Sequence, residues 1–171
     1  MNEVLKAENE ESALELLHEL QCTDGLPVVI PTRERVARMV LASGLDSELV
    51  LGELGPAGGV ASVEKVATAA VMAGCIPDYM PVVIAAVKAA ARPEFDLAEL
   101  QATTHCTAPL IIVNGPARKT CGPISSSYGA LGPGHRANAS IGRALRLCMI
   151  NIGGGRPGIS DMALLGHPGK F

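Results

Sequence analysis

Two neighbouring stretches set the framework of this chain: SVEKVATAAVM at residues 62–72 and PDYMPVVIAAVKAAAR at residues 77–92. Each predicts a helix, because Ser62 is a favourable N-cap and Pro77 suits the first position of a helix. Both helices carry so little charge that more than one side of each must be buried. We expect them either to cross the middle of the domain or to be covered by a partner subunit.

The segments on the N-terminal side predict helices and short strands in alternation. Residues 3–20 and Arg33–Ala42 have helical apolar periodicity, and Thr32 is a favourable N-cap for the second helix. A short apolar run follows each of these helices, and the runs Val28–Ile30 and Leu49–Leu51 predict buried strands. This order of elements favours an α/β fold.

The C-terminal side contains the best strand pattern in the chain. Pro109–Val113 is a continuous run of aliphatic residues, which is typical of parallel strands covered on both faces. The chain beyond it is dense in glycine, and a helix is predicted from about Asn138 to Ile152. We therefore predict a single α/β domain over residues 1–171, with a mixed sheet flanked by alanine-rich helices and a glycine-rich C-terminal half.

The composition argues against several classes of protein. A net charge of −3 and only two Phe, two Tyr and no Trp argue against a nucleic-acid partner. The N-terminus lacks a signal-peptide pattern, and the longest apolar run, Met80–Val87, is too short to span a membrane. The five cysteines are scattered without a C-x-x-C pair, and Cys75 and Cys148 stand in apolar contexts typical of a core. We expect a cytoplasmic protein that binds neither nucleic acid nor membrane.

The stretch GPGHRANASIGR at residues 132–143 is a candidate anion site. Its glycines permit close backbone approach, and Asn138 or Ser140 is a favourable N-cap for the helix that follows. The unpaired N–H groups and the dipole of a first helical turn favour a carboxylate, phosphate or sulfate group. The alternative interpretation is a surface loop capped onto a helix. The predicted substrate-binding residues are Asn114, Gly132, Gly134, Arg136, Asn138, Ser140 and Arg143.

Two histidines and two cysteines are the candidate catalytic residues. His105 and Cys106 precede the predicted 109–113 strand and Cys121 follows it, so an imidazole could activate a thiolate across the strand end. The same side chains together with His135 could instead hold a metal ion, although neither spacing is diagnostic. No metal ligand is therefore assigned, and the cofactor is left open.

Several blocks of this chain carry a resemblance to a known family. They are Asp24–Val29 with Pro31–Thr32, Val71–Cys75, Leu110–Pro116, Gly132–Leu147 and Pro168–Lys170. Together they resemble a poorly characterised bacterial family that is associated with proteins carrying a selenocysteine-or-cysteine–Gly–Ser–Cys (UGSC) motif. The resemblance implies no established reaction. This chain also departs from the motif, because Cys121-Gly122 is followed by Pro123, so no catalytic residue is carried over.

The resemblance also bears on assembly. Members of the family continue well past the Pro-Gly-Lys block, whereas this chain stops at Phe171. The resemblance therefore implies either that a separate subunit supplies the remainder or that an open edge is closed by self-association. Both versions predict a homo- or hetero-oligomer.

These observations lead to three hypotheses of function. The first is an enzyme or enzyme subunit that acts on a small carboxylate- or phosphate-bearing molecule held at Gly132–Ser140. A lyase or hydrolase is favoured, because the chain has no dinucleotide-binding fingerprint. The second is a non-catalytic structural subunit of a hetero-oligomeric enzyme, which uses the two apolar helices as its assembly surface. The third is a metal-binding protein that uses the Cys and His side chains named above.

Overall fold

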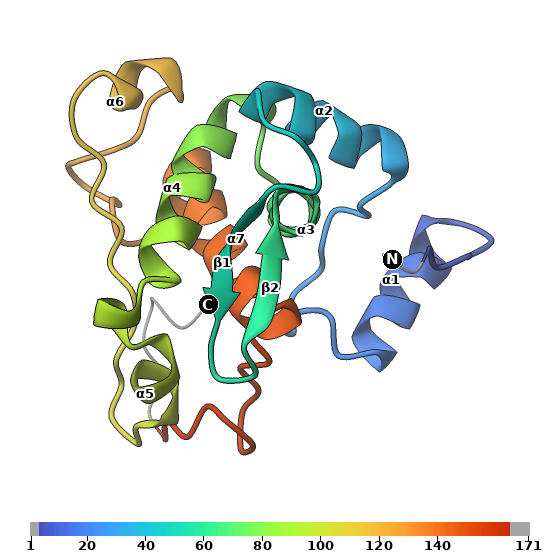
Figure 1. The fold of residues 1–171 in the computed structure, drawn as a ribbon. Coiled ribbons are helices and arrows are strands. Elements are labelled where there is room, and N and C mark those ends of the chain that lie inside the picture. Colours follow the sequence, from blue (N-terminus) through green and yellow to red (C-terminus); the bar gives the residue numbers. More distant parts are fainter. Residues whose placement is uncertain (1–3, 165–171) are drawn as a thin grey trace.

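The computed structural model describes residues 4–164, so the Pro168–Lys170 block of the resemblance lies outside the described residues. Figure 1 shows helices packed around one central helix, with a small hairpin beside it. The elements, with η marking short 3-10 turns, are α1 (Glu10–Glu19), α2 (Arg33–Ser43), β1 (Val50–Leu54), β2 (Gly59–Ser62), α3 (Val63–Met72), η1 (Pro77–Tyr79), α4 (Met80–Ala90), η2 (Pro93–Phe95), α5 (Leu97–Ala102), α6 (Ala117–Thr120) and α7 (Arg136–Asn151).

The central helix is α3, which Figure 1 shows end-on. It packs against α2, α4, α7 and β2 of the same chain, and seven of its ten residues are buried. The Ser62 hydroxyl caps the helix by accepting a hydrogen bond from the Lys65 N–H at 3.4 Å, as predicted. One chain therefore covers this helix, in agreement with the expectation that it crosses the middle of the domain.

The second alanine-rich stretch forms η1 and α4. Pro81 lies in the first turn of α4, where no helical donor is lost. Val83 and Val87 are fully buried, and α4 packs against α3 and α7. Its exposed side carries Ala85 and the charged Lys88. The apolar surface that the structural-subunit hypothesis requires is thus largely buried within this chain.

A two-stranded antiparallel hairpin is the sheet formed by the described residues. Strand β1 pairs with β2, with Gly52 opposite Ala61 and Leu54 opposite Gly59. The hairpin packs on the end of α7 so closely that a Cβ atom at Gly59 would lie 1.8 Å from the Ile152 carbonyl oxygen. The chain combines helices with a small sheet, as predicted, but this sheet is antiparallel rather than mixed.

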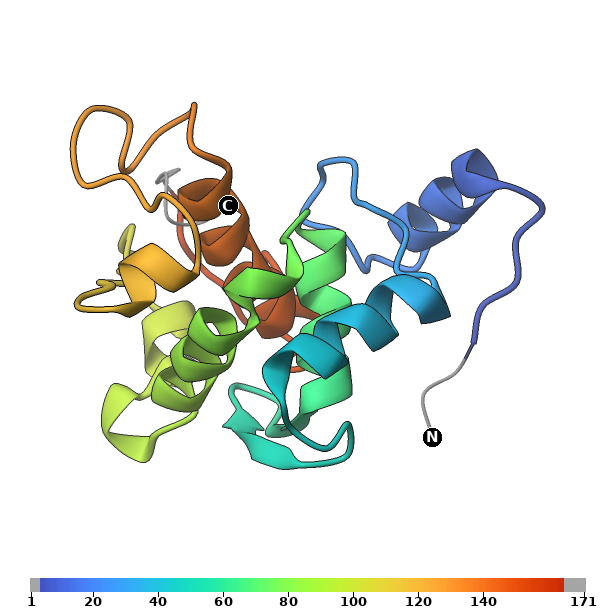
Figure 2. The ribbon, with the colours of Figure 1, turned by 90° about the horizontal axis from the view of Figure 1, so that it is seen from above.

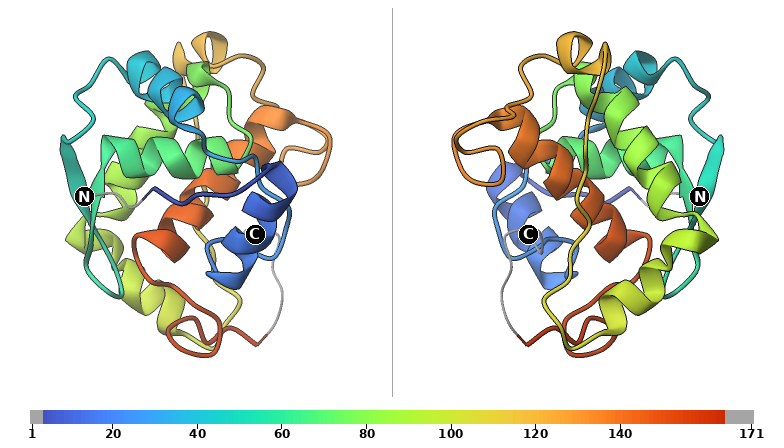
Figure 3. Two further views of the ribbon diagram at one scale, coloured as in Figure 1. Left: turned by 90° about the vertical axis from the view of Figure 1, so that its right-hand side faces the viewer. Right: turned by 90° about the vertical axis from the view of Figure 1, so that its left-hand side faces the viewer.

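Two of the predicted strands do not form. The backbone at Val28–Ile30 and Pro109–Val113 is outside any strand, although residue 29 donates to the Met72 carbonyl at 3.1 Å. Figure 3 shows the second segment running between α4 and α7. Its side chains alternate in exposure: Leu110 and Ile112 are 65% and 71% exposed, while Ile111 and Val113 pack on the core. Within residues 4–164, no strand pairs with this segment to complete a sheet.

Helix α7 begins earlier than predicted. Its N-cap is His135, and the helix starts at Arg136, not at Asn138 or Ser140. Both predicted caps lie inside the helix: the Asn138 side chain binds the preceding loop, and the Ser140 hydroxyl donates to the Arg136 carbonyl, one turn earlier in the same helix, at 2.7 Å. By contrast, Thr32 caps α2 as predicted.

Helix α1 stands apart from the rest of the fold. Figures 1 and 2 place it on the opposite side of the molecule from α6. Leu17 is its buried residue, and a groove of about 2290 Å³, lined mostly by apolar side chains, separates it from α2 and α3. An ion pair between Arg35 and Glu10, at 3.0 Å, bridges this groove. Within residues 4–164, no helix is long and apolar enough to cross a membrane.

Candidate anion-binding site

The charges of this chain are segregated along the sequence. Residues 100–160 contain no Asp or Glu but carry six basic side chains, whereas residues 1–99 contain sixteen of the seventeen acidic residues. A segment with this imbalance creates a positive surface that attracts anions. The overall charge of −3 conceals the imbalance, and a count by segment would have revealed it. The six basic residues are Arg118, Lys119, Arg136, Arg143, Arg146 and Arg156.

Three of these six side chains hold the fold together. Arg143 makes two hydrogen bonds of 2.8 Å to the Asp24 carboxylate and also donates to the Pro27 carbonyl at 2.9 Å. Arg146 pairs with Asp161 at 3.1 Å inside the protein. Arg156 donates to the Gln21 carbonyl, just after the end of α1, at 3.0 Å. The predicted substrate-binding role of Arg143 therefore has no support in its contacts.

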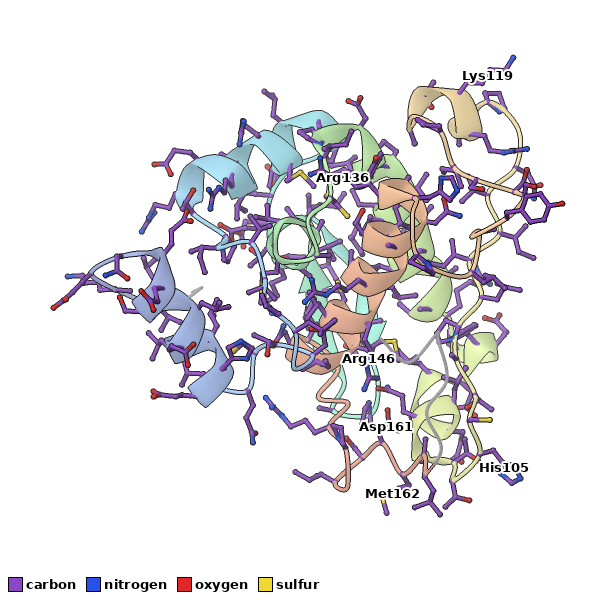
Figure 4. The ribbon with its side chains drawn as sticks, turned by 180° about the vertical axis from the view of Figure 1, so that it is seen from behind. His105, Lys119, Arg136, Arg146, Asp161 and Met162 are labelled. Atoms are coloured by element: carbon purple, nitrogen blue, oxygen red, sulfur yellow. The ribbon has the colours of Figure 1, made fainter. Side chains whose placement is uncertain are left out.

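The other three basic side chains belong to one end of the molecule. Arg118 and Lys119 lie on α6, and Arg136 is the first residue of α7. Figure 4 shows Lys119 at an outer corner and Arg136 nearer the centre of the same half of the molecule, with Arg146 and Asp161 in the other half. All three side chains are exposed, and Arg118 also donates to the Ser126 hydroxyl at 3.1 Å.

The start of α7 presents unpaired donors at this end. His135 provides no side-chain cap, and the first main-chain bond of the helix runs from the Ala139 N–H to the His135 carbonyl at 3.0 Å. The N–H groups of residues 136, 137 and 138 therefore have no acceptor among the described residues. Such donors, together with the helix dipole, form an environment that favours an anion.

The loop before α7 is anchored to its first turn by Asn138. The Asn138 amide nitrogen donates to the carbonyls of Ser125 and Ala130, both at 3.0 Å, and its oxygen accepts the Ser125 N–H at 2.9 Å. The predicted glycines lie in this exposed loop, and Gly134 has a φ of +114°, which favours glycine. Asn138 thus positions the loop rather than a substrate.

A pocket of about 760 Å³ lies beside this loop. It is lined by the start of α6, including Arg118 and Lys119, and by Pro123 and Ile124 from the loop. Asn114, which was predicted to bind substrate, directly precedes Gly115 in the pocket wall. Part of the pocket wall is therefore formed by the loop that Asn138 fixes to α7.

Arg136 connects the start of α7 to the end of α3. Its guanidinium donates twice to the Gly74 carbonyl, at 3.0 and 2.8 Å. The neighbouring thiol of Cys75 is buried, and burial raises its pKa to about 11, although a bond to the Ser140 carbonyl and the charge of Arg136 oppose the shift. Cys75 is thus a protonated core residue, as predicted, and Ser140 contributes its carbonyl to that core.

The four predicted catalytic residues are not brought together. His105 and Cys106 lie in an exposed loop after α5, and Figure 4 shows His105 at the opposite end from Arg136. Cys121 is buried after α6, and the His135 ring nitrogen Nε2 is 3.2 Å from the Tyr128 carbonyl oxygen. Over the part of the chain that the structure describes, no group of three His, Cys, Asp or Glu side chains could hold a metal ion.

His135, Arg136 and the loop glycines thus adjoin one another along the chain at the start of α7, whereas Asn114 adjoins the pocket next to α6. Arg118 and Lys119 line that pocket, and no sequence motif marked them. The resemblance to the UGSC-associated family remains a prediction. No family model, curated protein or solved structure matches this chain.

Proposed function

We propose that this chain binds a small carboxylate- or phosphate-bearing molecule at the start of α7 and serves as an enzyme, or enzyme subunit, of lyase or hydrolase type. The observation that supports the proposal is that α7 begins with unpaired N–H groups, in a segment that carries exposed cations and has no acidic residue from position 100 to 160. An anion there gains hydrogen bonds from main-chain donors that have no competing acceptor within residues 4–164.

Each part of the site would have a distinct role. The N–H groups of residues 136–138 would bind the anion directly, while Arg118 and Lys119 would supply charge from α6. His135 would be the candidate for proton transfer, because it occupies the N-cap position of the same helix turn and its ring nitrogen lies 3.2 Å from the Tyr128 carbonyl oxygen. His105 lies at the opposite end of the molecule from Arg136 and Cys106 is its neighbour in the chain, so neither would take part, and the buried Cys121 is not exposed to a ligand.

Binding of inorganic phosphate and of malonate, measured by calorimetry at constant ionic strength, tests the proposal. The wild-type chain should bind one of these anions, and Lys119→Ala with Arg118→Ala should weaken that binding about tenfold, or roughly 1.4 kcal/mol. Lys88→Ala removes an exposed cation from α4 and serves as the matched control. Equal affinity in all variants, or no binding of either anion, would rule out this site.

Arg136 needs a separate variant because it also supports the fold. Arg136→Ala removes both hydrogen bonds to Gly74, so a loss of binding must be compared with the thermal stability of the variant. The proposal predicts weaker anion binding even at temperatures where the variant is fully folded.

A further inference from the structure

Helix α1 presents an acidic surface on the side of the molecule opposite the basic end. Glu11, Glu15 and Glu19 recur every four residues, so they share one exposed face of the helix. None of the three has a basic partner among the ion pairs of the described residues. Because Leu17 is the buried residue of α1 and a groove separates the helix from α2 and α3, a partner can reach α1 from outside.

The basic end has the complementary chemistry. Arg118 and Lys119 on α6 are exposed, and no Asp or Glu occurs anywhere in residues 100–160. Exposed apolar side chains occur in the loop that follows α6, where Tyr128 is 95% and Leu131 is 77% exposed. A surface that combines positive charge with apolar side chains suits an acidic amphipathic helix.

The two surfaces of one copy cannot meet each other. Figures 1 and 2 show α1 and α6 at opposite sides in two perpendicular views. Two copies placed antiparallel, however, bring each acidic helix against the basic end of the other copy. This arrangement forms two equivalent contacts between an acidic α1 and a basic end, so it gives a two-fold dimer and not an open chain.

We propose that α1 of each copy docks through Glu11, Glu15 and Glu19 on the α6 end of a second copy, around Arg118 and Lys119. Exposed ion pairs contribute little singly, so the exposed Leu20, at the end of α1, and Leu131, in the loop after α6, supply apolar contact. The inference does not rest on the proposed anion binding, although the two occupants use the same cations and compete.

Sedimentation velocity on the full chain tests this pairing, at about 0.02 M and about 0.5 M salt, because salt screens such contacts. A dimer is expected at low salt, with dissociation in high salt. Glu11→Lys/Glu15→Lys and Arg118→Glu/Lys119→Glu should each raise the dimer dissociation constant by more than about tenfold. Glu53→Lys on β1 and Lys88→Glu on α4 are the matched controls and should leave the dimer intact.

Mixing the two charge-reversed variants provides the sharpest result. In the mixed pair, the basic α1 of one variant faces the acidic α6 of the other, and the two unaltered surfaces face each other, so a one-to-one heterodimer should form. A wild-type monomer at low salt, dimers unaffected by both reversals, chains longer than a dimer, or a mixture that stays monomeric would each overturn the proposal. Phosphate binding by the dilute monomer is measured separately, so failure of one proposal leaves the other standing.

Discussion

Replacing Asp24 with Asn tests how the N-terminal segment is held to α7. The Asp24 carboxylate receives two hydrogen bonds of 2.8 Å from Arg143, and the side chains are 3% and 19% exposed. The two residues are 119 positions apart, so this pair fixes a long-range contact. Asn keeps the shape but loses the charge and one acceptor, which leaves the largely buried guanidinium without its counter-ion.

The expected loss of stability is large for a single substitution. Breaking one side of a buried ion pair costs about 3–5 kcal/mol, and the partial exposure of Arg143 places Asp24→Asn near the lower value. About 3 kcal/mol lowers the melting temperature of a chain of this size by roughly 6–12 °C. Glu53→Gln, which removes an exposed carboxylate from β1, should change stability by no more than about 0.5 kcal/mol.

The pH dependence provides a second readout. Burial alone would raise the pKa of Asp24, but the hydrogen bonds and charge of Arg143 outweigh it and hold the pKa below its ordinary value of 3.8. A carboxylate with a lowered folded-state pKa stabilises the protein above its unfolded pKa, and that stability is lost as the pH falls through the folded pKa. The gap between wild type and Asp24→Asn should be full at neutral pH and close below about pH 4.

Thermal unfolding followed by circular dichroism measures both effects. The reasoning is refuted if Asp24→Asn melts with the wild type at neutral pH, or if the gap persists unchanged in acid. The double variant Asp24→Asn/Arg143→Met separates the pair from its surroundings, because it should lose less than the sum of the two single variants.

Three further predictions concern thiols and glycines. Burial raises the pKa of Cys75 to about 11 and that of Cys148 to about 12. A thiol reagent at about pH 8 should therefore label the exposed Cys106 before these two cysteines. Equal labelling rates for the three cysteines, measured by mass spectrometry, would contradict this. A Cβ atom at Gly142, inside α7, would have no neighbouring atom within 4 Å, so Gly142→Ala should stabilise the fold by about 1 kcal/mol in denaturant titration. A lower free energy of unfolding would contradict the helical conformation of this residue. Gly59→Ala should cost about 1–3 kcal/mol in the same titration, because its Cβ meets a main-chain oxygen, and an unchanged midpoint would refute the close packing.

The helices could be predicted because their signals are local. Apolar periodicity and the caps Thr32 and Ser62 located α2 and α3, and Gly44 ends α2 in a left-handed conformation, as its position indicates. The prediction for Pro109–Val113 was wrong in one respect, because a strand depends on a partner that the local pattern cannot provide. The same run does expose and bury its side chains alternately.

The candidate site was predictable only in part. The turn before α7 could be recognised from glycine and its basic neighbours, but Arg143 was assigned to substrate because its partner Asp24 is remote in sequence. Asn138 and Ser140 satisfied the local rule for an N-cap, yet the Asn138 side chain binds the preceding loop, and the Ser140 hydroxyl donates to a carbonyl one turn earlier in the same helix. The roles of polar side chains therefore depended on contacts that no local pattern contains.

A titration of nitrogen-15-labelled protein with inorganic phosphate, followed by amide NMR, tests whether the start of α7 binds an anion. Donors that bind an anion change their chemical shifts, so we expect the largest changes at the N–H groups of Arg136, Ala137 and Asn138, with smaller ones on α6. Saturable shifts confined to these amides would support anion binding at the start of α7. Shifts that centre on another part of the fold, or a spectrum that phosphate leaves unchanged, would contradict it.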